Sequence, residues 1–163
     1  MKKQMFTCML LSLAITSASA GGLVFSPKSC DFSVEFPNEY KIREHSLGGV
    51  QALGAASGKG AGNTRFGAEC WRIERQLTIE EISRGMEEQA KLRGITISSN
   101  IIDKSDKNQV QAMLYGLLTA DGKKIHVKLM AIIGKTTRLD LSIIDSELLK
   151  QSHVDFRNSV KLQ

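Results

Sequence analysis

The sequence predicts an α+β fold in which a twisted, mainly antiparallel sheet packs against two helices and one disulfide bridge ties the chain. Three observations lead to this expectation. Apolar and polar residues alternate over several segments, as in half-buried strands. One segment in the middle of the chain has helical periodicity between clear start and stop signals. Two cysteines remain once an amino-terminal leader is set aside.

Residues 1–20 have the features of a cleavable secretory signal peptide. A short basic start precedes an apolar run over residues 5–15, and Ala18-Ser19-Ala20 has the small-residue form that signal peptidases recognise. A membrane anchor is the alternative, but the run is shorter than the roughly 20 apolar residues that span a bilayer. We therefore expect an exported chain, periplasmic or secreted, with one domain over residues 21–163 and no stable membrane insertion after cleavage.

Removal of the leader changes both the charge and the cysteine count. The net charge falls from +5 to +3 without Lys2 and Lys3, and this modest, scattered surplus argues against a nucleic-acid partner. Cys8 leaves with the leader, so Cys30 and Cys70 remain, and a cysteine pair in an exported domain most often forms a disulfide. Two separate buried thiols are the alternative. The bridge would close a loop of about 40 residues, worth roughly 4 kcal/mol.

Strand-like alternation occupies much of the chain after the leader. Asp121-Gly122 is a strong hairpin signal between two alternating segments, and Gly134-Lys135 marks a further turn. The pattern is strand-like again from Ile95, although the polar stretch over residues 101–108 favours a hydrophilic turn. The strands are expected near residues 23–26, 30–36, 40–42, 66–73, 110–118, 125–133 and 139–143.

Two helices complete the predicted fold. In the first, Thr78 and Glu81 form a capping box, and Gly94 is suited to end the helix in the left-handed conformation. The second lies near the carboxyl end, with Ser146 as its expected cap. Its expected buried stripe comprises Leu148, Leu149, Ser152, Phe156 and Val160.

A glycine-rich segment over residues 48–63 is predicted to be a loop, mobile at least over residues 54–63, because glycine loses much backbone entropy on folding. It lacks the spacing and the final Ser or Thr of a phosphate-binding loop. Loops on rigid scaffolds often carry binding residues. Candidate partner-binding residues are therefore His45, Lys59, Asn63 and Arg65. A functionally silent loop is the alternative.

Trp71 is a further candidate for partner binding. It is the only tryptophan, and it adjoins Cys70. If Cys70 points into the core, the strand alternation directs Trp71 to the other face of the sheet. There it is either covered by a helix or exposed as an anchor for a partner, since tryptophan is enriched at interface hot spots.

Catalytic and metal-binding patterns are weak in this sequence. The three histidines are widely separated, too few cysteines and histidines are suitably placed for a structural zinc, and G-x-S-x-G does not occur. Cys70 could serve as a thiol nucleophile only if it is not bridged to Cys30. We therefore predict no catalytic residue, no cofactor and no metal site.

The order of elements resembles the PsbP/Mog1-like fold. The residues that carry the resemblance are Phe32–Pro37 followed by Tyr40, the helix Thr78–Arg93, and the closing segment Phe156–Val160. The resemblance covers most of the chain after the leader. It implies a fold that often serves as an accessory or binding module rather than as an enzyme.

These expectations favour a non-enzymatic exported protein-interaction module in the periplasm, such as an inhibitor, immunity or envelope accessory protein. Its partner would be another envelope or secreted protein. Two alternatives remain open. One is a small periplasmic hydrolase that uses acidic residues, and the other is a carrier of a small apolar ligand held between sheet and helix.

Overall fold

The computed structural model describes residues 23–47, 50–57, 64–106 and 109–163; the expected leader lies outside them. The elements follow one another as β1 (Leu23–Phe25), β2 (Phe32–Phe36), β3 (Tyr40–Leu47), β4 (Val50–Ser57), β5 (Arg65–Arg72), α1 (Ile79–Leu92), β6 (Thr96–Asp106), β7 (Gln109–Ala120), β8 (Lys123–Ile133), β9 (Thr137–Asp145), α2 (Gln151–Asn158) and β10 (Lys161–Leu162). Within these residues no helix is both long and apolar enough to cross a membrane.

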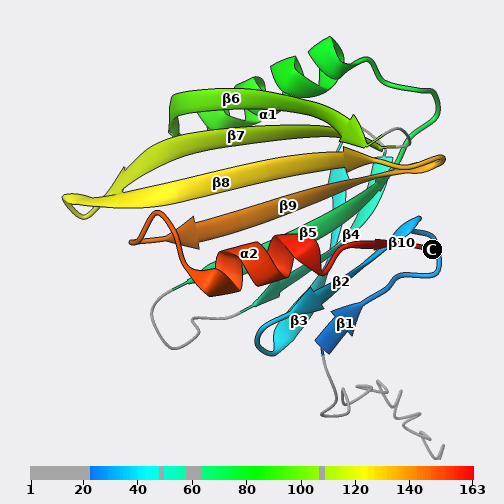
Figure 1. Ribbon diagram of the computed structural model, residues 1–163, viewed down its shortest axis with the longest axis horizontal. Helices are drawn as coiled ribbons and strands as arrows, with labels where there is room; N and C mark the ends of the chain where they lie inside the picture. The colour runs from blue at the N-terminus through cyan, green and yellow to red at the C-terminus, as the bar shows by residue number, and fades with distance from the viewer. Residues whose placement is uncertain (1–22, 48–49, 58–63, 107–108) are drawn as a thin grey trace, which may run out of the picture.

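The strands form two antiparallel sheets rather than one (Figure 1). The large sheet has the order β3-β4-β5-β9-β8-β7-β6, and the small sheet has the order β1-β2-β10. The antiparallel pairing and the two helices confirm the predicted α+β class, with strands as the dominant element. The β7–β8 hairpin turns at Asp121 and Gly122, which both have positive φ, as the Asp-Gly signal predicts.

Helix α1 covers one face of the large sheet. The predicted capping box is present: Thr78 Oγ1 accepts from the Glu81 N–H, and the Glu81 carboxylate accepts from the Thr78 N–H. Gly94 follows the helix with φ of 70°, as expected for a left-handed end. Apolar residues on one side of the helix pack over β7 and β8 in a core cluster that includes Ile82, Met86, Ala90, Ala112, Leu114 and Val127.

Helix α2 and the small sheet cover part of the opposite face (Figure 1). Phe156 of α2 packs edge-on against Phe36 of β2 and in a tilted contact against Phe66 of β5, with ring centroids 5.1 and 4.8 Å away. These rings join Leu139 and Leu141 of β9 in a second core cluster. Because the side chains of a strand alternate between faces, the two clusters lie on opposite sides of the same sheet.

Two connections attach the amino-terminal segment to the large sheet. Cys30 and Cys70 form the expected disulfide, which links the approach to β2 with β5. Beside it, the Asp31 carboxylate accepts hydrogen bonds from the N–H groups of Thr136 and Thr137 at 2.7 and 2.9 Å. Partial burial raises the pKa of Asp31, but these hydrogen bonds outweigh it, so the pKa lies below the ordinary value.

The predicted loop over residues 48–63 is wrong for residues 50–57, which form β4; residues 48–49 lie outside the described part of the chain. Strand β4 pairs with β3 on one side and with β5 on the other, and Gly54 lies opposite both Arg43 and Glu69. Hydrogen bonding on both sides and the burial of Ala55 and Ser57 offset the entropy that glycine loses. Residues 58–63 lie outside the described residues.

Two further expectations are corrected near the ends of elements. The polar stretch predicted as a turn is strand up to Asp106, because β6 pairs with β7; residues 107–108 are outside the described part of the chain. Helix α2 begins at Gln151, and Ser146 does not cap it. Leu148 and Leu149 precede the helix and are 51% and 71% exposed instead of buried.

Candidate functional site

A groove lies between α2 and strands β7, β8 and β9, on the face of the large sheet that α2 covers. We call it the α2 groove. The small sheet and α2 cover only part of this face (Figure 1). The space in it amounts to about 80 Å³. Its lining comprises Met113, Tyr115, Lys128, Leu129, Met130, Leu141, Ile143, Leu149, His153, Val154 and Arg157.

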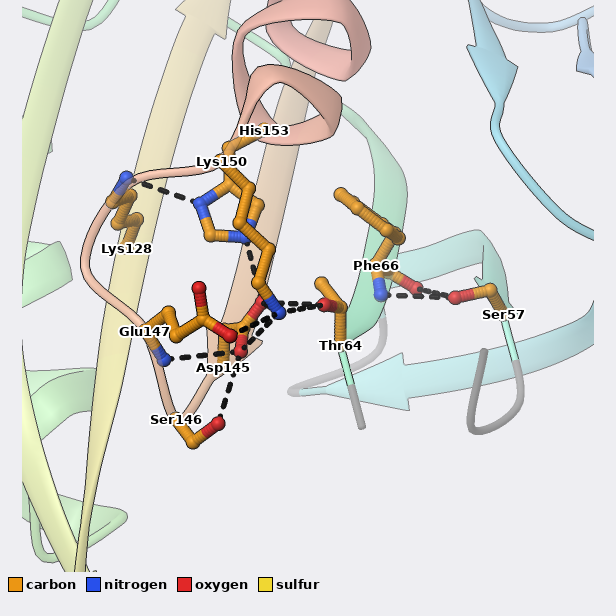
Figure 2. A network of polar contacts seen from close by, with 9 residues as sticks. All are labelled: Ser57, Thr64, Phe66, Lys128, Asp145, Ser146, Glu147, Lys150 and His153. Atoms are coloured by element: carbon orange, nitrogen blue, oxygen red, sulfur yellow. Dashed lines mark hydrogen bonds and ion pairs between the residues drawn. The ribbon is translucent and has the colours of Figure 1, made fainter. Parts of the chain in front are cut away.

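A buried polar pair supports one wall of the α2 groove. His153 of α2 and Asp145 at the end of β9 are 3% and 2% exposed. His153 Nε2 lies 2.9 Å from Asp145 Oδ2, and Figure 2 shows the ring between this carboxylate and Lys128. Lys128 Nζ is 3.3 Å from His153 Nδ1. An ammonium can only donate, so Nδ1 accepts and Nε2 carries the proton that Asp145 accepts.

Asp145 is held as a carboxylate by its neighbours. Burial alone raises its pKa, but hydrogen bonds from the Thr64 hydroxyl, the Glu147 N–H, Lys150 and His153 outweigh burial, and its pKa lies well below the ordinary aspartate value. Lys150 Nζ lies 3.0 Å from Asp145 Oδ2 and 3.2 Å from Glu147 Oε1. The charge of Asp145 is therefore balanced by Lys150 (Figure 2).

Lys128 is a cation in a partly apolar setting. Burial is the main cause that lowers its pKa, the nearby positive charge of Arg157 lowers it further, and Asp145 acts weakly in the opposite direction. The ammonium also lies 5.9 Å from the centre of the Tyr115 ring. Within the described residues, neither Lys128 nor Arg157 makes an ion pair.

The Asp145–His153 pair is arranged for support rather than for nucleophilic catalysis. A hydrolytic triad needs a hydroxyl or thiol on the second ring nitrogen of the histidine. In the described part of the chain, the two ring nitrogens of His153 contact a carboxylate and an ammonium. Cys70, the other candidate nucleophile, is in the disulfide. The pair fixes the orientation of α2 against β9 and presents Lys128 to the groove.

The candidate residues from the sequence lie elsewhere. His45 pairs with Ala52, and Ala52 pairs with Trp71, so the backbones of these residues form one row across β3, β4 and β5. The His45 side chain, Lys59 and Asn63 lie outside the described residues. Arg65 begins β5 and is exposed.

Trp71 follows the predicted alternation. Cys70 is buried on the side of the small sheet, and Trp71 points to the other face, where it is half-buried and its Nε1 is buried without a hydrogen-bond partner among the described residues. It therefore does not line the α2 groove.

The groove residues were missed by reasoning from the sequence, although part of the signal was present. Lys124, His126 and Lys128 occupy alternate positions of β8 and so share the face that carries the groove. His153 and Arg157 are four residues apart on α2, which places them on one side of that helix. The contact between His153 and Asp145 depends on where α2 begins, and the expected Ser146 cap placed that beginning wrongly.

A second, more polar cleft lies under α1. Glu69 and Asp140 are direct cross-strand neighbours there, and Arg138 Nε contacts Asp140 Oδ1 at 2.5 Å. Burial raises the pKa of Asp140 despite this arginine. Across the described ranges, no group of three or more His, Cys, Asp or Glu side chains is placed to hold a metal ion.

No family model and no curated protein matches this sequence.

Proposed function

We propose that this protein is an exported, non-enzymatic interaction module that binds another envelope or secreted protein, as an inhibitor, immunity or envelope accessory protein does. The observation that carries this proposal is the α2 groove. It is open and largely apolar, it is supported by a buried hydrogen-bonded network, and its histidine contacts Lys128 instead of a nucleophile. Such a site suits binding better than turnover.

Two features support an exported location within this proposal. The first 20 residues have the pattern of a secretory leader. The Cys30–Cys70 disulfide suits an oxidising compartment such as the periplasm. Together they favour partners that are themselves exported.

A carrier of a small apolar ligand is the second candidate function. The space of about 80 Å³ between sheet and helix, with Met113, Met130, Leu141 and Ile143 in its wall, favours it. Native mass spectrometry of the protein from its own source distinguishes the two functions, because a carrier retains a small molecule through purification.

A site-specific crosslinking experiment tests the interaction module. A photoreactive amino acid replaces Leu149 at the mouth of the groove and, as a matched control, Leu92 of α1, which is also an exposed leucine but on the other side of the sheet. We expect a discrete protein adduct in the source envelope from the Leu149 position and none from the Leu92 position. Equal labelling from both positions, or turnover by the mature chain of peptidoglycan, phosphoester or ester substrates, would contradict the proposal.

A further inference from the structure

Two cations line the α2 groove, and no Asp or Glu of the described chain is among its lining residues. Lys128 comes from β8 and Arg157 from α2, and both side chains line the groove, where the positive charge of Arg157 lowers the pKa of Lys128. Both acids of the adjoining network, Asp145 and Glu147, contact Lys150. An anion placed between Lys128 and Arg157 would relieve their repulsion and gain charge-assisted hydrogen bonds.

The basic character continues along β8. Lys124 and His126 share the strand face of Lys128, because residues two apart in a strand point the same way. The Lys124 ammonium extends the positive charge beyond the groove along one strand. A ligand with several negative charges in an extended chain fits this arrangement better than a single small anion does.

Apolar surface adjoins the cations. Met113, Met130 and Ile143 line the interior of the groove. Leu148 and Leu149, 51% and 71% exposed, lie at the entrance to α2, and Leu149 is part of the lining. Ile101 of β6, 44% exposed, pairs with Met113 and extends the apolar surface away from α2.

The extent of this surface indicates the kind of ligand. The space of about 80 Å³ is sufficient for one apolar side chain, while Leu148 and Ile101 are not among its lining residues and would stay in water around a small molecule. Exposed apolar residues gathered around a pocket with a polar rim are typical of protein-binding sites.

We propose that the α2 groove binds an acidic segment of a partner protein, with one apolar side chain seated among Met113, Met130 and Ile143 and flanking carboxylates on Lys128 and Arg157. This inference rests on the proposed interaction function and names the chemistry of the partner. The exposed leucines before α2 then pack against the apolar neighbours of the seated residue.

Selection from a library of random peptides about a dozen residues long, displayed against the immobilised mature protein, tests this inference. We expect enriched peptides to carry Asp or Glu on both sides of Leu, Met or Phe. Their binding should weaken about tenfold in the Arg157→Glu variant and about fivefold in the Leu149→Ser variant. It should also weaken as the salt concentration rises, because charges at the rim are screened.

Matched variants on α1 control for charge and for exposed apolar area. Arg84→Glu makes the same charge change as Arg157→Glu, and Leu92→Ser makes the same change as Leu149→Ser, both on the opposite side of the sheet. Both controls should bind like the wild type, and thermal unfolding of all four variants confirms that each is folded.

The outcomes separate the inference from the function on which it rests. Enriched peptides that are neutral or basic, or that bind Arg157→Glu as well as they bind the wild type, overturn the acidic partner but leave an interaction module in place. A selection that enriches no peptide counts against both.

Discussion

His153 Nε2 donates to Asp145 Oδ2 over 2.9 Å inside the core, and this bond joins α2 to the end of β9. Both side chains are almost fully buried; His153 forms part of the wall of the α2 groove, and Asp145 is not among its lining residues. The same carboxylate also accepts hydrogen bonds from the Thr64 hydroxyl, the Lys150 ammonium and the Glu147 N–H (Figure 2). One acidic residue thus holds the segment before β5, the β9–α2 connection and the helix in place.

Replacing Asp145 should therefore destabilise the fold. We expect Asp145→Asn to lower the free energy of unfolding by about 3 kcal/mol, because it removes a buried charge that Lys150 and His153 contact. Urea denaturation followed by circular dichroism measures the change. Asp155→Asn on the exposed side of α2 is the control and should cost less than about 0.5 kcal/mol. Equal losses for the two variants would show that the buried network does not hold α2.

The contribution of Asp145 should also depend on pH. Its pKa in the folded protein lies below the ordinary value near 4, so the stabilisation is complete above about pH 5 and is lost as the pH falls through the folded-state pKa. We expect the difference in unfolding free energy between wild type and Asp145→Asn to shrink progressively below about pH 4. The raised pKa of Asp140 makes its contribution to stability change with pH in the opposite direction. Because this contribution is the same in both proteins, it cancels in the difference between them. A difference in unfolding free energy that stays constant with pH would contradict the lowered pKa of Asp145 in the folded protein.

The disulfide should be a structural support. It closes a sequence separation of 40 residues, so reduction or the double variant Cys30→Ser, Cys70→Ser should lower the unfolding free energy by about 4 kcal/mol. Thiol titration of the native protein should find no free thiol at either position. Labelling of both cysteines in the unreduced native protein would rule the bridge out.

Replacing Gly116 and Gly85 by alanine should change the stability of the fold in opposite directions. A Cβ on Gly116 of β7 would lie 2.9 Å from the backbone oxygen of Thr96, so Gly116→Ala should destabilise by about 2 kcal/mol. Gly85 lies within α1, and a Cβ there would meet nothing closer than an Arg138 nitrogen at 4.0 Å. Gly85→Ala should therefore stabilise by about 0.7 kcal/mol. Thermal unfolding of both variants checks the pair, and a stabilising Gly116→Ala would show that β6 and β7 are less closely packed.

Local signals account for the parts of the fold that the sequence predicts well. The capping box at Thr78 and Glu81 and the turn at Asp121-Gly122 depend on neighbouring residues alone, and both are confirmed. Strand β4 was missed because its glycines and alanines have little strand preference of their own. It is stabilised by two partner strands, one of which is β5, and a single segment carries no sign of that pairing.

The candidate site was harder to predict because its members come from separate parts of the chain. Lys128, Asp145, His153 and Arg157 meet only through the β8–β9 pairing and the position of α2. His45 and Arg65 were chosen for their nearness to the predicted loop, and Trp71 as the only tryptophan, beside Cys70; neither Arg65 nor Trp71 lines the groove. The resemblance to the PsbP/Mog1-like fold and the export of the chain stay predictions.

The most direct test of the α2 groove as a binding site is a nuclear magnetic resonance titration of residues 21–163 with an acidic peptide enriched by the display selection. We predict that amide shifts concentrate at Tyr115, Lys128, Leu149 and Arg157, while Arg84 and Leu92 on α1 stay unchanged. Shifts that concentrate on α1, or on the β3–β5 part of the sheet, with none at Lys128 and Arg157, would contradict the account.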